Sequence, residues 1–163
     1  MSKQPGIRTA AKALIVREGY LLAIAKRDTH GLWYLLPGGG QHHGETLEQA
    51  LLRECLEEIG TLVKIDKLLF VREFIGKNHI TYSPNNTPND EWARNAHTID
   101  FIFACHVCEE YILQNGVSPD DNQEKVEWLP ISNLAEYRLY PSALKHLLIT
   151  SQIQQNIYLG DIH

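Results

Sequence analysis

Three glutamates with helical spacing, Glu54, Glu57 and Glu58, are the residues of this sequence best suited to chemistry. Successive residues of an α-helix are about 100° apart, so the three carboxylates fall within an arc of about 100°. Carboxylates this close repel one another, and a helix tolerates them mainly where a cation is bound. Clustered carboxylate oxygens suit Mg²⁺ or Mn²⁺ as ligands. A divalent metal site is therefore one interpretation, and a solvated acidic helix face is the other.

A run of three glycines, residues 38–40, shortly precedes these acids and favours the metal interpretation. Glycine lets the backbone approach a ligand or a metal closely and adopt dihedral angles that other residues avoid. A glycine-rich loop that leads into a helix bearing carboxylates indicates a site for a metal and a phosphate. The loop is not a P-loop, because no Gly-Lys-Ser/Thr sequence follows it.

The helix that carries the acids has clear start and stop signals. Thr46 and Gln49 fit a capping box, and Gly60 lies where a helix commonly ends in a left-handed residue. The spacing therefore predicts a helix over 46–59, with its apolar arc against the core. Arg53 precedes Glu57 by one turn, so the two side chains can pair.

Strands must supply the rest of the framework. The first two are predicted at 9–16 and 20–25, as a hairpin with Gly19 in its turn. Further strands are expected at 33–36, 62–75, 97–107 and 126–129, and a closing helix at 141–154. Strands arranged around two helices indicate a layered α/β or α+β domain.

Length and composition exclude several classes of protein. The chain has 163 residues, 44% of them hydrophobic and 21% charged, which suits one globular domain. Its net charge of −5 argues against a general nucleic-acid-binding surface, and it has no apolar run long enough to span a membrane. The odd count of three cysteines and the absence of a signal-peptide pattern predict a cytoplasmic protein.

The segment from Gly39 to Thr61 resembles the signature of the Nudix hydrolases, G-x5-E-x7-R-E-U-x-E-E-x-G-U, in which U is a bulky aliphatic residue. The fixed positions are all filled at the required spacing, by Gly39, Glu45, Arg53, Glu54, Glu57, Glu58 and Gly60. The two U positions depart from the pattern, with Cys55 and Thr61, and neither departure removes an acid. The resemblance extends over about residues 7–150, and we take 1–163 as one Nudix domain.

This resemblance implies a fold and a reaction. The expected fold is an α/β/α sandwich, with a mixed sheet between two main helices. The expected reaction is Mg²⁺-dependent hydrolysis of a nucleoside diphosphate linked to another group, with Mn²⁺ as the alternative metal. The substrate would be a nucleotide sugar such as ADP-ribose, or a (deoxy)nucleoside triphosphate, oxidised forms included. A non-catalytic domain that senses a ligand or binds a partner is the alternative function, and the resemblance also allows a homodimer.

The resemblance also implies roles for the residues of the signature. Glu57 and Glu58 would bind the metal, and the carbonyl of Gly39 would complete its shell. Glu54 would be a further ligand or the base that activates water. Arg53 would orient a carboxylate.

Candidates outside the signature are less specific. Glu124, with Glu127 and Glu73 as alternatives, is a candidate for the general base. Arg8 and Arg27 are candidates for contacts with a substrate phosphate. Each is otherwise a solvated surface charge.

The polar segment 77–96 is expected to be a loop that sets substrate choice. Its aromatic residues Tyr82 and Trp92 are candidates to stack on a base. They are otherwise anchors of the loop or part of a dimer contact.

Overall fold

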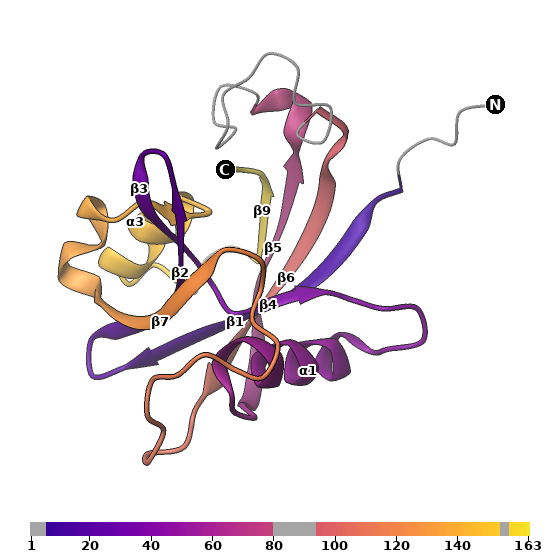
Figure 1. Ribbon diagram of the computed structural model, residues 1–163. Coiled ribbons are helices and arrows are strands. Elements are labelled where there is room, and N and C mark those ends of the chain that lie inside the picture. Colours follow the sequence, from indigo (N-terminus) through magenta and orange to yellow (C-terminus); the bar gives the residue numbers. More distant parts are fainter. Residues whose placement is uncertain (1–5, 80–93, 154–156) are drawn as a thin grey trace.

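The computed structural model describes residues 6–79, 94–153 and 157–163, and a curled, mixed β-sheet lies at its centre (Figure 1). The strands follow the order β8-β3-β2-β1-β6-β5-β9, with β4 paired to β1 and β7 paired to β2. Their bounds are β1 Arg8–Arg17, β2 Tyr20–Asp28, β3 Gly31–Leu35, β4 Gly38–Gly40, β5 Lys64–Ile75, β6 His97–His106, β7 Gln123–Pro130, β8 Leu139–Tyr140 and β9 Tyr158–Asp161. The helical elements whose bounds lie within the described residues are α1 Leu47–Ile59, α3 Ala143–Ile149 and the 3₁₀ turns η1 Gly76–Asn78 and η3 Ile131–Glu136.

Strand β1 joins the two halves of the sheet. Its residues 8–15 pair in parallel with residues 98–105 of β6, whereas only Val16 and Arg17 pair with β2. Glu18 and Gly19 both have positive φ angles, as a two-residue hairpin turn of type I′ requires. The predicted hairpin is confirmed, but its two strands diverge after two residue pairs. Most residues of β1 therefore pair with β6 rather than with β2.

Helix α1 begins and ends where the sequence predicts. The Thr46 side chain accepts a hydrogen bond from the backbone of Gln49, and the Gln49 side chain accepts one from the backbone of Thr46. Gly60 closes the helix in the left-handed conformation, with φ 70°. No helix in the described part of the chain is long and apolar enough to span a bilayer.

Two apolar clusters form on opposite faces of the sheet, because successive strand residues point to opposite faces. In β2, Leu22 and Ile24 join one cluster, whereas Leu21 and Ala23 join the other. Helix α1 covers the first cluster, and α3 and η3 cover the second (Figure 1). The predicted arrangement of a mixed sheet between two main helices is therefore confirmed.

The structure differs from the sequence-based expectations in several details, and three of them bear on the site. Residues 38–40 form β4 rather than a loop, because they pair with residues 10–12 of β1. The closing helix covers only Ala143–Ile149 instead of 141–154, because Ser151 adopts a positive φ of 55°. Strand β9 has no counterpart among the predicted elements, and it pairs in parallel with the end of β5.

Candidate active site

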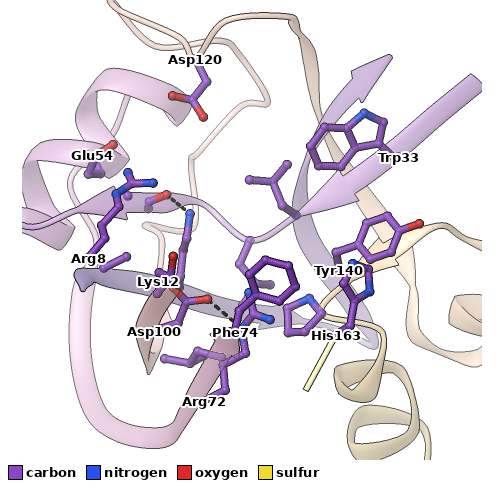
Figure 2. Close-up of a pocket in the computed structure, with 18 residues that line it drawn as sticks. Arg8, Lys12, Trp33, Glu54, Arg72, Phe74, Asp100, Asp120, Tyr140 and His163 are labelled. Atoms are coloured by element: carbon purple, nitrogen blue, oxygen red, sulfur yellow. Dashed lines mark hydrogen bonds and ion pairs between the residues drawn. The ribbon is translucent and has the colours of Figure 1, made fainter. Parts of the chain in front are cut away.

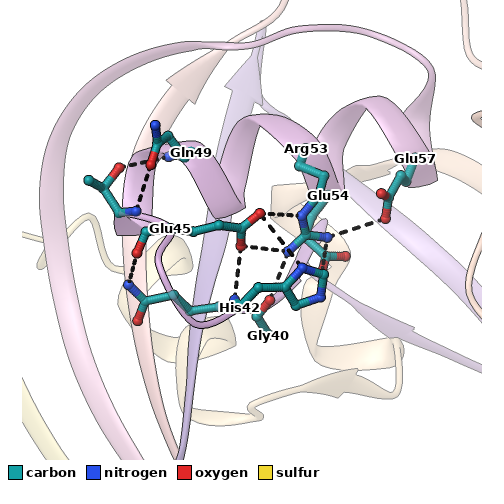
Figure 3. Close-up of polar contacts among 9 residues, drawn as sticks. Gly40, His42, Glu45, Gln49, Arg53, Glu54 and Glu57 are labelled. Carbon is teal, nitrogen blue, oxygen red and sulfur yellow. Dashed lines mark hydrogen bonds and ion pairs between the residues drawn. The ribbon is translucent and has the colours of Figure 1, made fainter.

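Arg53 links α1 to the segment that precedes it (Figure 3). Its Nε and Nη2 atoms donate to the two carboxylate oxygens of Glu45, at 2.7 and 3.0 Å, and Nη2 also donates to the carbonyl of Gly40 at 2.9 Å. Its Nη1 atom donates to Glu54 at 2.8 Å and to Glu57 at 3.4 Å. The hydrogen bonds from Arg53 and from a backbone N–H lower the pKa of Glu45 to about 2. One guanidinium thus fixes three carboxylates and the end of β4.

Strand β4 is glycine because other atoms fill the space around it: the backbone of β1 at Gly38, and side chains at Gly39 and Gly40. The backbone N–H of Gly38 donates to Oε2 of Glu58 at 2.7 Å, and the carbonyl of Gly38 accepts a hydrogen bond from Lys12. A Cβ atom on Gly39 would lie 2.5 Å from Oε2 of Glu54. The strand therefore approaches two acids of α1 as closely as a backbone can.

The three acids of α1 differ widely in exposure. The Glu57 side chain is 36% exposed and that of Glu54 is 12% exposed, whereas Glu58 is 1% exposed. Burial raises the pKa of Glu58 to about 8, although the charge of Lys12 and the N–H of Gly38 act in the opposite direction. The interpretation of this arc as a solvated acidic face is wrong for Glu58.

The donor set fits a hard divalent cation in its chemistry. Glu58 carries a buried oxygen, Oε1, that has no hydrogen-bond partner among the described residues. A buried carboxylate oxygen without a partner is costly unless a positive group satisfies it. In the described ranges, no three His, Cys, Asp or Glu side chains converge closely enough to hold a metal as they stand. Arg53 bonds one oxygen each of Glu54 and Glu57, so these two acids would have to turn towards a cation.

A cavity of about 360 Å³ opens beside these acids (Figure 2). Arg8, Ala10 and Lys12 line it from alternate positions of β1, as the two-residue period of a strand dictates. Glu54 and Gly39, which lie against each other, also line the cavity. Figure 2 shows Glu54 at the same end of the cavity as Arg8. Two cations and a carboxylate thus share one wall, which suits an anionic ligand that carries a metal.

Asp120 also lines the cavity, and the sequence-based reasoning missed it. It precedes β7 and pairs with Lys26 at 2.8 Å. Burial alone would raise the pKa of Asp120, but the hydrogen bond from Lys26 and the charge of Lys12 lower it below its usual value. The only sequence signal was a pair of aspartates, Asp120 and Asp121, in a polar segment.

The segment that carries Asp120 is bound to the end of α1. The backbone N–H groups of Gly116 and Ser118 donate to the carbonyls of Glu58 and Glu57, both at 3.0 Å. The side chain of Gln123 donates to the carbonyl of Glu58 at 2.8 Å. The last carbonyls of the helix are thereby satisfied by the segment that presents Asp120.

The remaining candidates lie in different places. Arg8 lines the cavity, whereas Arg27 and Glu124 form an ion pair with each other and are not among the lining residues. Glu73 accepts a hydrogen bond from Tyr158, and Glu127 accepts one from Tyr34 at 3.2 Å; neither acid lines the cavity.

Tyr82 and Trp92 lie outside the described residues, so their predicted stacking on a base remains a prediction.

Comparison with known proteins agrees with this geometry. The sequence matches the family model of the NUDIX domain over residues 6–148. Among curated relatives, the RNA pyrophosphohydrolase of Acinetobacter baylyi is 40% identical over 62 residues, 38% of this chain and 37% of the relative. The ADP-ribose pyrophosphatase of Methanocaldococcus jannaschii is 27% identical over 127 residues, 77% of this chain and 63% of the relative. The matches to several of the curated relatives span about a third or less of their length.

The fold has solved counterparts. The crystal structure of the MutT NUDIX hydrolase from Burkholderia pseudomallei aligns with 86% of this chain and 95% of its own, with a TM-score of 0.60 and 24% sequence identity. At this level of identity, the similarity shows a shared fold.

Proposed function

This chain belongs to the NUDIX family, and we propose that it hydrolyses a nucleoside diphosphate linked to another group, with Mg²⁺ as its metal. The observation that carries the proposal is the joining of the signature residues into one network beside a cavity. Arg53 donates hydrogen bonds to Glu45, Glu54 and Glu57. Glu58 accepts a hydrogen bond from the backbone N–H of Gly38 in the glycine strand β4. A structural helix would not need this concentration of buried or partly buried acid.

Glu57, Glu58, Glu54 and the carbonyl of Gly39 are the groups that would hold the metal. When bound, a divalent cation neutralises phosphate charge and lowers the pKa of a coordinated water. Arg53 orients Glu54 and Glu57, because its planar donors fix carboxylates in a defined geometry. This positioning matters because phosphoryl transfer depends mainly on alignment and electrostatics.

Arg8 and Lys12 are suited to bind the phosphates. Both line the cavity from β1, on the wall that Glu54 and Gly39 also line. Two fixed positive charges would attract the anionic part of a nucleotide and hold it near the acids. Arg27 forms an ion pair with Glu124 and does not line the cavity. It could contact a substrate phosphate only if this ion pair broke.

The general base must lie within reach of the attacking water. Of the candidate acids, Glu54 and Asp120 line the cavity, whereas Glu73, Glu124 and Glu127 do not. We therefore place the proton acceptor at a carboxylate oxygen of Glu54 or Asp120. Asp120→Asn should abolish the acidic limb of the pH–rate profile only if Asp120 accepts the proton, and Glu54→Gln should do so only if Glu54 accepts it.

Two substrate classes fit the proposal: a nucleotide sugar such as ADP-ribose, and a (deoxy)nucleoside triphosphate. The name of the M. jannaschii relative supports the first, and that relative aligns with most of this chain. The alternative function is a non-catalytic domain that senses a ligand. The complete set of signature acids favours catalysis, because a sensor has no need of them.

A metal-supplemented substrate screen tests the proposal. Nucleotide sugars, dinucleoside polyphosphates and nucleoside triphosphates would be incubated with Mg²⁺ or Mn²⁺, and the products separated by chromatography. We expect cleavage of a phosphoanhydride bond, with loss of turnover in Glu57→Gln. Binding of nucleotides without any metal-dependent cleavage would instead support the sensing domain.

A further inference from the structure

A second cavity, of about 400 Å³, lies on the face of the sheet that α3 and η3 cover. The cavity beside α1 is lined by Arg8 and Lys12 of β1 and extends to His163. The second cavity is lined by Leu14 and Val16, the next residues of β1 that point to the same face. Among the described residues, the two cavities share no lining residue. The second cavity is therefore a separate site, which the proposed hydrolysis does not use.

The floor of the second cavity crosses three neighbouring strands. Ala104 of β6 pairs with Leu14 of β1 on one side and with Lys67 of β5 on the other, and all three residues line the cavity. The middle residue of this row has the smallest side chain. It therefore leaves space over the sheet that a larger side chain would fill.

Helix α3 is too short to cover this part of the sheet. Its seven residues span about 10 Å, whereas the ten residues of β6 span about 33 Å. The remaining walls of the cavity come from Ile131 of η3, Leu148 of α3 and Ile153, which follows the helix. The cavity is thus bounded by the sheet on one side and by aliphatic side chains on the other.

The second cavity is apolar inside and polar at its mouth. The lining residues that are buried or half-buried are Leu14, Val16, Leu69, Ala104, Cys105, Ile131, Leu148 and Ile153. The exposed lining residues are all polar, namely Lys67, His106 and Ser151. A positive charge therefore lies at the entrance to an aliphatic interior. A cavity of roughly 150 Å³ with such a lining can bind benzene, and natural ligand pockets begin at about 300 Å³, so this cavity can hold a larger ligand.

We propose that the second cavity binds the hydrocarbon chain of a free aliphatic carboxylate of medium length, with the carboxylate at the mouth beside Lys67. The interior selects a chain without polar groups, because a polar group buried among aliphatic side chains loses its hydrogen bonds to water. The ammonium of Lys67 selects an anionic head group. The side chains of His106 and Ser151 can add hydrogen bonds to the carboxylate oxygens.

Titrations of the wild-type protein with hexanoate, octanoate and decanoate test the proposal without any nucleotide or metal. Each methylene group that the cavity buries should raise the affinity by about 3- to 4-fold, so octanoate should bind about 10-fold more tightly than hexanoate. Octylammonium has the same chain with the opposite charge, and it should bind more weakly than octanoate because Lys67 repels it. Equal affinities along the chain-length series, or for the two head groups, would overturn the proposal.

Two variants of the cavity and two matched controls locate the ligand. Ala104→Leu fills the cavity from its floor and should weaken octanoate binding about 10-fold or more, whereas Lys67→Met should weaken it about 1.5- to 5-fold. Arg8→Met removes a positive charge from the cavity beside α1, and Ile112→Ser removes an aliphatic side chain that is 79% exposed. Both controls should leave the affinity unchanged. A loss of binding in either control, without a loss in Ala104→Leu, would place the ligand elsewhere and overturn the proposal.

A measurement on the unaltered protein protects the test against misfolding of Ala104→Leu, whose melting temperature checks its fold. In the wild-type protein, NMR should detect contacts between the chain protons of octanoate and the methyl groups of Leu14, Leu69 and Ile153. Contacts with other methyl groups only, or no binding up to the solubility limit of decanoate, would overturn the proposal. The cavity would then be a packing gap beside the short helix α3.

Discussion

Replacing Gly39 by alanine should separate catalysis from folding at strand β4. The new Cβ atom would lie 2.5 Å from Cδ of Glu54, whereas carbon atoms settle about 3.5 to 4.0 Å apart. The Glu54 carboxylate must therefore move by about 1 Å. It can do so at little cost in stability, because it is the end of a flexible side chain. A misplacement of about 1 Å near the reacting atoms costs about 100-fold in rate, or about 2.7 kcal/mol.

Gly38→Ala is the matched comparison, one residue away. Gly38 has a φ of 119°, and its new Cβ atom would overlap the backbone carbonyl oxygen of Ala11, which cannot rotate aside. We expect a loss of about 3 kcal/mol or more in the free energy of unfolding, which lowers Tm by about 6 to 12 °C. Gly39→Ala should keep its Tm within about 3 °C of wild type while its kcat falls about 100-fold on every substrate. A Gly39→Ala protein with wild-type kcat, or with the same loss of Tm as Gly38→Ala, would refute the reasoning.

Three further predictions concern the metal and pH. Glu57→Gln and Glu58→Gln should each lower kcat by about 100-fold or more on all substrates alike, as steady-state rates on a substrate panel would show. Mg²⁺ at 10 to 100 times its Kd should stabilise the wild-type fold by about 1 to 3 kcal/mol, and melting curves of Glu58→Gln should lack most of this shift. The hydrogen bond from Arg138 lowers the pKa of Asp28 to about 2. The ionised Asp28 therefore stabilises the folded state above pH 4, and this contribution to the free energy of unfolding is lost as the pH falls towards 2. Acid unfolding of Asp28→Asn should lack this component, about 1 kcal/mol after solvent screening.

The sequence predicts local structure at this site better than it predicts burial. Helix α1 could be bounded because Thr46, Gln49 and Gly60 carry their signals within a few residues of the helix ends. The burial of Glu58 could not be predicted from neighbouring residues in this way. Its burial depends on β4, which packs over it only because residues 38–40 pair with residues 10–12 of β1, 26 to 30 positions earlier in the chain.

The parts of the cavity that the sequence did not reveal come from long-range contacts. Asp120 reaches the cavity because Gly116 and Ser118 bind the end of α1, and two N–H groups in an irregular segment leave no periodic pattern. His163 reaches the cavity through β9, a strand of four residues that is too short to stand out by composition. The signature residues, by contrast, were identifiable because their spacing follows the helix.

The pairing of β1 also constrains the order in which the protein can fold during synthesis. Eight residues of β1 pair with β6, whose last residue is His106, whereas only two pair with the neighbouring β2. A nascent chain that ends before β6 can therefore form the β2–β3 pairing and helix α1 but cannot complete the centre of the sheet. Strand β1 cannot pair with β6 until about 90 further residues have been synthesised. At ribosomal rates of about 5 to 20 residues per second, this takes several seconds. During that interval its apolar residues Ala11, Ala13 and Ile15 lack β6, so β1 is the segment we expect to need protection from aggregation.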